Sequence, residues 1–149
     1  MTYRWVEHTA EVELEIESAS EPEVFEDALH ALAELLGVAE PLGVAEPLGV
    51  AEPLGVAGGE STSRRRLTAH ATDRPALLAA WVEELAFLAE SEGFVATRVE
   101  SIDLSERSVR ATVAGVLGKP PPLVKAVTYH RLAFEPRGPG YVARVVLDV

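Results

Sequence analysis

Apolar and acidic residues alternate without a break from Glu11 to Glu17, and this period of two fits an extended strand that buries one face. Val12, Leu14 and Ile16 are the apolar members, so we expect them to face the core. Glu13, Glu15 and Glu17 are then expected to form a solvated face. Residues 3–8 predict another short strand directly before this one. The chain therefore starts with two consecutive strands, which excludes an all-helical fold.

Two segments show the three- and four-residue apolar spacing of amphipathic helices. The first starts at Ser20, which with Glu23 forms a capping-box pattern, and ends near Gly37. The second starts after Asp73, a good N-cap residue, and ends at Gly93. Further strands are predicted at about 65–72, 95–104, 108–117, 124–135 and 141–148. This order predicts the α+β class, as a two-layer domain with both helices on one face of a mixed or antiparallel sheet of about six strands.

A tandem repeat interrupts this pattern. The hexapeptide GVAEPL occurs three times between residues 37 and 54, and residues 55–57 begin a fourth copy. Each copy contains a proline, which cannot donate to a strand ladder, and the copies are identical. We therefore predict that residues 37–59 form a surface linker, with a functional recognition segment as the alternative. The length of 149 residues otherwise fits a single domain over 1–149.

Composition excludes several classes of function. Without cysteine the chain has no disulfide, no thiolate metal site and no cysteine nucleophile. No apolar run is long enough to span a membrane, and the N-terminal residues lack a secretion signal, so a cytoplasmic location is expected. No nucleophile elbow of the G-x-S-x-G type is present. Asparagine and glutamine are also absent, which suggests a thermophilic source.

Charge is distributed unevenly along the chain. The net charge is −11, but residues 1–60 hold 14 acidic residues and one basic residue, Arg4. Tight nucleic-acid binding depends on neutralising phosphates, so independent nucleic-acid binding is not expected. A cation or a basic protein partner is favoured instead.

Carboxylates are the most promising chemical groups. Hard divalent cations such as Ca²⁺, Mg²⁺ or Mn²⁺ prefer several oxygen ligands. Glu11 follows a turn at residues 8–10, and Asp148 stands beside Val149, whose α-carboxylate supplies further oxygens. If the last strand pairs beside Glu11, these groups form one oxygen-rich site.

Three segments carry a family resemblance. Residues 8–11 (HTAE) resemble the H-T-A-D element of the archease family, residues 125–130 (KAVTYH) match its K-A-V-T-Y-H stretch, and residues 143–149 resemble its closing strand. The resemblance implies a non-enzymatic cofactor that helps an RtcB-type tRNA-splicing RNA ligase become guanylylated and turn over repeatedly. It also implies a divalent-metal site at Glu11, Asp148 and Val149. Lys125, with His8 and His130, would belong to the same functional surface.

Two positions depart from the family pattern. Glu11 replaces the family's aspartate, and Leu123 stands where many members have an acidic residue. Two other classes of function stay open. One is a small metal-dependent phosphoester hydrolase with His8 or His130 as general base, and the other is an acidic protein-binding or chaperone-like module.

Overall fold

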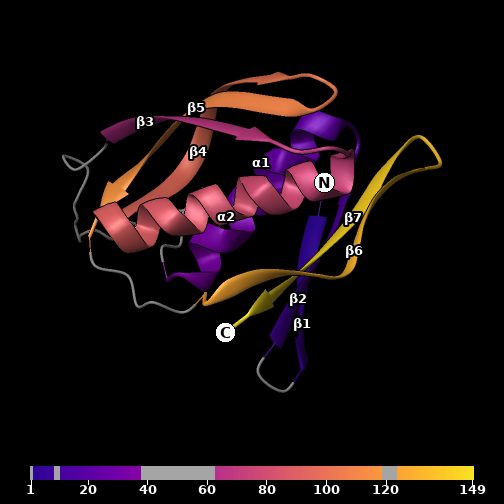
Figure 1. Ribbon diagram of the computed structural model, residues 1–149, viewed down its shortest axis with the longest axis horizontal. Coiled ribbons are helices and arrows are strands. Elements are labelled where there is room, and N and C mark those ends of the chain that lie inside the picture. The colour runs from indigo at the N-terminus through magenta and orange to yellow at the C-terminus, as the bar shows by residue number, and fades with distance from the viewer. Residues whose placement is uncertain (1, 9–10, 38–62, 119–123) are drawn as a thin grey trace, which may run out of the picture.

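The computed structural model describes residues 2–8, 11–37, 63–118 and 124–149 (Figure 1). Leu123 and nearly all of the predicted linker at 37–59 lie outside these residues. The strands and helices are β1 (Thr2–His8), β2 (Glu11–Ser18), α1 (Glu21–Leu35), β3 (Ser63–His70), α2 (Arg74–Glu92), β4 (Phe94–Leu104), β5 (Ser108–Leu117), β6 (Ala126–Arg137) and β7 (Gly140–Asp148).

The strands form two antiparallel sheets, with the orders β1-β2-β7-β6 and β3-β5-β4. The α+β class and the order of helices and strands are confirmed. One feature differs from the expectation: seven described strands divide into two sheets, where a single sheet of about six was expected. The chain passes from the first sheet to the second between β2 and β3 and returns to the first between β5 and β6.

Both helices begin and end as the sequence indicates. Ser20 Oγ accepts a hydrogen bond from the N–H of Glu23 at 3.4 Å, and the Glu23 carboxylate accepts one from the N–H of Ala19. Asp73 caps α2 by accepting from the N–H of Ala76 at 2.9 Å. Gly93 ends α2 with a φ of 68°, a left-handed conformation that costs glycine little.

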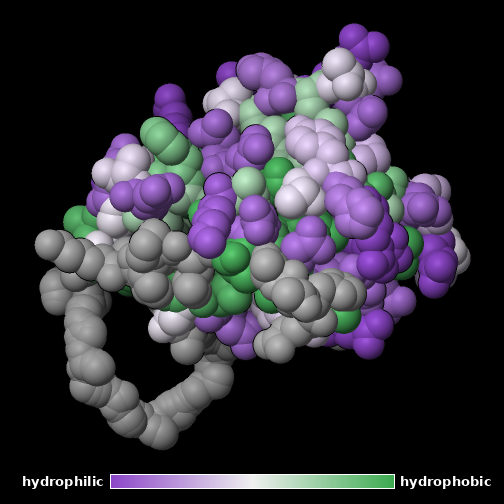
Figure 2. Space-filling model, turned by 60° about the horizontal axis from the view of Figure 1, so that its bottom comes forward, coloured by the Kyte–Doolittle hydropathy of each residue, from purple (hydrophilic) through white to green (hydrophobic). Residues whose placement is uncertain are grey.

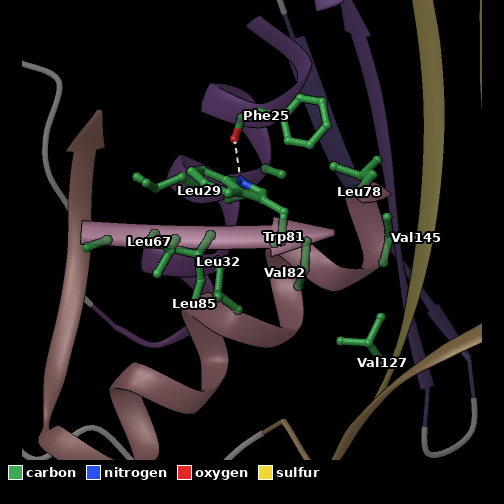
Figure 3. Close-up of a cluster of buried hydrophobic side chains, with 14 of the residues drawn as sticks. Phe25, Leu29, Leu32, Leu67, Leu78, Trp81, Val82, Leu85, Val127 and Val145 are labelled. Carbon is green, nitrogen blue, oxygen red and sulfur yellow. Dashed lines mark hydrogen bonds between the residues drawn. The ribbon is translucent and has the colours of Figure 1, made fainter. Parts of the chain in front are cut away.

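The hydrophobic core lies where the helices meet both sheets. α1 packs against β2 and β4, and α2 packs against β6 as well as β3 and β4. Trp81 is fully buried, and its indole N–H donates to the carbonyl of Phe25 at 2.9 Å (Figure 3). Leu67 from one sheet and Val145 from the other enter this same cluster. Each sheet therefore has an inner face toward the helices and an outer face that points away from them.

The outer surface is mainly polar. In Figure 2 hydrophilic residues cover most of the described surface on the side shown, and apolar residues appear in smaller patches. No described helix is long and apolar enough to cross a bilayer.

Candidate functional site

The two ends of the sequence meet in the four-stranded sheet. β2 pairs with β7 in an antiparallel register that places Glu11 directly opposite Asp148. In the β1–β2 pair Glu11 is opposite His8, and in the β6–β7 pair Asp148 is opposite Ala126. Side chains of directly opposed residues start about 4.5–5.5 Å apart on the same face. The expected pairing of the last strand beside Glu11 is therefore found.

These two carboxylates lie on the outer face of the sheet. Leu14 and Ile16 of β2 are buried toward the helices, so alternation turns Glu11 and the other glutamates of the strand to the opposite side. Glu11 and Asp148 are both half-buried. Their position on neighbouring central strands fixes the backbone on both sides of the pair.

The segment before β6 is tied to the same place. The N–H of Lys125 donates to the carbonyl of Asp148 at 2.7 Å, so Lys125 lies next to the proposed ligand in space. Its side chain is exposed. Val149 is half-buried and packs against the hydrophobic core, which anchors the backbone that follows Asp148. Lys125, Asp148 and Val149 are thus brought together at the end of β7.

The KAVTYH segment contains a large irregularity of β6. Regular pairing with β7 breaks after Thr128 and resumes at Ala133, and the intervening Arg131 has a φ of 61°. Tyr129 is 58% exposed and His130 is exposed, with its N–H donating to Thr128 Oγ1 at 3.2 Å. No hydrogen bond or ion pair joins His130 to Glu11 or Asp148 within the described part of the chain. The bulge displays His130 to solvent rather than directing it to the carboxylate pair.

Glu13 differs from the expected solvated face. It is 1% exposed, and its carboxylate contacts Arg131 Nη2 at 3.1 Å and Arg144 Nε at 3.2 Å. The two arginines come from β6 and β7, and the bulge that carries Arg131 is what brings its guanidinium over β2. Sequence reasoning missed this cluster, because alternation shows only which face Glu13 is on and not what covers it.

Glu15 continues this charged row along β2. Arg4 Nε lies 2.7 Å from Glu15 Oε1 across the β1–β2 pair. A hydrogen bond with Glu13 and, next in size, one with Arg4 hold the pKa of the Glu15 carboxyl below its ordinary value. The outer face of the sheet is thus an arginine–glutamate network with the Glu11–Asp148 pair at one end.

The donor chemistry at that end suits a hard cation. Glu11 and Asp148 offer only carboxylate oxygens, the ligand type that Ca²⁺, Mg²⁺ and Mn²⁺ prefer. The described side chains contain no group of three or more histidines, cysteines, aspartates or glutamates arranged to hold a metal ion. The two carboxylates therefore supply two side-chain ligands, and further oxygens have to come from the main chain, water or a partner.

Comparison with known proteins places the chain in a family. A family model described as "Archease protein family (MTH1598/TM1083)" matches residues 3–149. The protein archease of Methanosarcina acetivorans is 31% identical over 156 residues, covering 99% of this chain and 95% of that protein. The protein archease of Pyrobaculum islandicum is 27% identical with the same coverage.

Two solved structures share the fold. Protein 1598 of Methanobacterium thermoautotrophicum superposes with a TM-score of 0.63 at 22% identity, covering 99% of this chain and 98% of that one. An archease of Thermotoga maritima, described as a possible chaperone, gives a TM-score of 0.62 at 21% identity, covering 100% and 98%. From the match of the family model over nearly the whole sequence, this chain belongs to the archease family.

Proposed function

We propose that this protein is a non-enzymatic activator of an RtcB-type tRNA-splicing RNA ligase, acting through a divalent cation at Glu11, Asp148 and Val149. The observation that carries the proposal is the register of β2 and β7, which sets Glu11 directly opposite Asp148. Membership of the archease family supports the choice of partner, because the ligase is the partner that the family resemblance implies.

The chemistry at this end of the sheet favours an accessory role. Glu11 and Asp148 would hold the ion, with Val149 as the third residue of the site that the family resemblance implies. A bound divalent cation supplies positive charge that can counter the phosphates of a nucleotide during guanylylation of the ligase. The family resemblance implies that the ligase performs the covalent steps, so we assign them to the ligase.

Lys125 extends the proposed surface. Its backbone N–H is hydrogen-bonded to the carbonyl of Asp148. Its side chain is exposed, so the ammonium group can contact a phosphate or a carboxylate of the ligase. Tyr129 and His130, displayed by the β6 bulge, are exposed on the same strand and are available to contact a partner.

The sequence departures define what is particular to this member. Glu11 has one methylene more than aspartate, so its oxygens reach roughly 1.5 Å further from the strand. The ion must therefore lie further from β2, or the side chain must fold back. Leu123 removes an acidic group that many family members carry, so the proposed surface depends more strongly on Glu11 and Asp148.

The test is multiple-turnover RNA ligation by the cognate ligase at substoichiometric concentration, with and without this protein. We expect stimulation by the wild type and its loss in Asp148→Ala and Glu11→Ala. Glu17→Ala is the matched control, because Glu17 lies on the same face of β2 but is opposite Val142. Equal product yields with and without wild-type protein would refute the proposal.

Structural damage is separated from loss of function by melting. With excess chelator, Asp148→Ala and the wild type should unfold at nearly the same temperature. Hydrolysis of phosphoesters by this protein alone would instead support the metal-dependent hydrolase. Capture of many unrelated unfolded proteins, without stimulation of the ligase, would support the chaperone-like module.

A further inference from the structure

The outer face of the three-stranded sheet gathers arginines in an otherwise acidic protein. Inner positions of β3 and β5, such as Leu67 and Val113, are buried against the helices. The intervening positions point the other way, and the register sets Arg66 opposite Thr112 and Thr68 opposite Arg110. We call this outer surface the arginine face, and its charged side chains are Arg64, Arg66, Arg98, Glu100, Asp103 and Arg110.

A shallow depression of about 310 Å³ lies on the arginine face. Its polar lining consists of guanidinium, hydroxyl and carboxylate groups from all three strands: Arg66, Thr68, Ser101, Asp103, Arg110 and Thr112. The hydroxyl-bearing side chains are short, and the longer Arg66 and Arg110 project beside them from β3 and β5. The depression crosses all three strands, so an extended ligand can lie across them.

Much of the positive charge on this face is available. Arg66 is exposed and has no ion pair or side-chain hydrogen bond within the described part of the chain. Arg110 Nη2 is 3.7 Å from Asp103 Oδ2, and both side chains are over 70% exposed, so that pair is weak. Glu100 is the carboxylate that holds arginines firmly, at 2.6 Å from Arg64 and 3.1 Å from Arg98.

This chemistry matches phosphates better than it matches an acidic protein. Guanidinium groups bind phosphate oxygens in a bidentate manner, and serine and threonine hydroxyls are common donors to nucleic-acid backbones. Protein–protein interfaces are usually centred on buried aromatic or aliphatic anchors. Among the described residues, the centre of the arginine face carries hydroxyl groups and Ala114 instead of such anchors. Ala114 is already buried and so offers no apolar surface to a partner.

We propose that the arginine face binds the sugar–phosphate backbone of an RNA strand. The inference rests on the proposed function in one respect, since the RNA would be the substrate of the ligase that this protein activates. The two sheets flank the helices, so the arginine face and the Glu11–Asp148 pair lie on different outer surfaces (Figure 1). One surface can contact the ligase while the other contacts its RNA.

The net charge of −11 sets the strength of this contact. Repulsion from the acidic remainder keeps the affinity of the isolated protein for RNA low and orients the arginine face toward the strand. Binding to the ligase supplies a high effective concentration of RNA, so a weak contact becomes occupied in the complex.

The experiment is an NMR titration of the isotope-labelled full chain with a 20-nucleotide oligouridylate at low salt. Amide signals of residues 64–68 and 108–112 should shift most. Arg66→Glu should weaken binding about tenfold and lower the salt dependence, by about 0.7 in the log–log slope for each phosphate that the variant no longer neutralises. Arg137→Glu changes the charge equally on the β6–β7 hairpin and should weaken binding no more than about twofold.

Three results would overturn the inference: no shifts on β3 and β5, equal weakening by the two substitutions, or binding of a polyglutamate of the same length as tight as that of RNA. The last result would point to an acidic protein as occupant. Stimulation of the ligase is measured separately on the same variants. In the wild type, stimulation of the ligase without RNA shifts on β3 and β5 would refute only this inference, whereas mapped RNA shifts without any stimulation would refute only the proposed function.

Discussion

Arg144 and Glu13 form an ion pair across β7 and β2, with Nε and Oε2 3.2 Å apart and the glutamate 1% exposed. The buried Nε is not aligned for a hydrogen bond, so the contact is mainly electrostatic. Arg131 approaches the same carboxylate from the β6 bulge at 3.1 Å. The cluster joins three elements that are far apart in sequence.

Arg144→Leu should lower the free energy of unfolding by about 2 kcal/mol, because it leaves a buried carboxylate with less compensation. Glu13→Leu removes the buried charge itself and leaves two partly exposed arginines that water can solvate. Its expected effect is within about 1 kcal/mol of zero. Urea unfolding at pH 7 measures both. A larger loss for Glu13→Leu than for Arg144→Leu would contradict this account of the cluster.

Trp81→Phe should destabilise the protein by about 2 kcal/mol. The substitution removes the hydrogen bond to the carbonyl of Phe25 and leaves a cavity at a fully buried position. It also disturbs the edge-to-face packing of the two rings, whose centroids are 5.8 Å apart. Phe87→Leu, at a side chain that is 59% exposed, is the control and should change urea stability by less than about 0.5 kcal/mol. Similar losses in the two variants would argue against this view of the core.

Asp27→Asn should raise the melting temperature at pH 7. Asp27 is buried in α1 and accepts a hydrogen bond from Ser18 Oγ, and burial raises the pKa of its carboxyl. A raised pKa in the folded state favours the protonated form. The stabilisation of the folded protein by the protonated Asp27 carboxyl is therefore complete below the unfolded pKa of about 3.9. This stabilisation is lost as pH rises through the folded pKa.

The gain from Asp27→Asn should accordingly shrink as pH falls toward 4. Each kcal/mol corresponds to about 2–4 °C for a chain of this size. Calorimetric melting between pH 4 and pH 8 checks the trend, with Glu83→Gln on the exposed side of α2 as the control. An asparagine variant that melts below the wild type at pH 7 would contradict the cost assigned to the buried carboxylate.

Glu11→Asp should tighten Mn²⁺ binding at the proposed site about tenfold. The shorter side chain restores the geometry implied by the family pattern and shortens the reach from β2 by roughly 1.5 Å. Electron paramagnetic resonance of free Mn²⁺ measures the affinity. Glu17→Asp makes the same chemical change on the same face and should leave the affinity unaltered. Weaker binding by Glu11→Asp would show that this chain has adapted its site to glutamate.

Local patterns in the sequence predicted most of the elements. The alternation in β2 and the caps Ser20 and Asp73 depend on neighbours within a few residues, so they can be recognised without knowing the fold. The division into two sheets could not be predicted in this way, because it depends on which distant strands pair. Nothing in the residues of β5 and β6 shows that they belong to separate sheets.

The candidate site shows the same contrast. The proximity of Glu11 and Asp148 could be predicted once the last strand was expected to lie beside the first turn. The burial of Glu13 could not, since it depends on a bulge in β6 and on Arg131 adopting a left-handed backbone. Such a conformation is uncommon for residues other than glycine and is maintained by its surroundings.

The position of β7 between β2 and β6 has a consequence for biosynthesis. A nascent chain makes β1 and β2 first, but the neighbour that completes this sheet is β7, which emerges from the ribosome much later. Until then one edge of β2 has open hydrogen-bonding groups, a situation that invites pairing with other chains. The row of glutamates on β2 discourages such pairing through charge repulsion, so the acidity of this strand protects the unfinished protein as well as shaping the finished one.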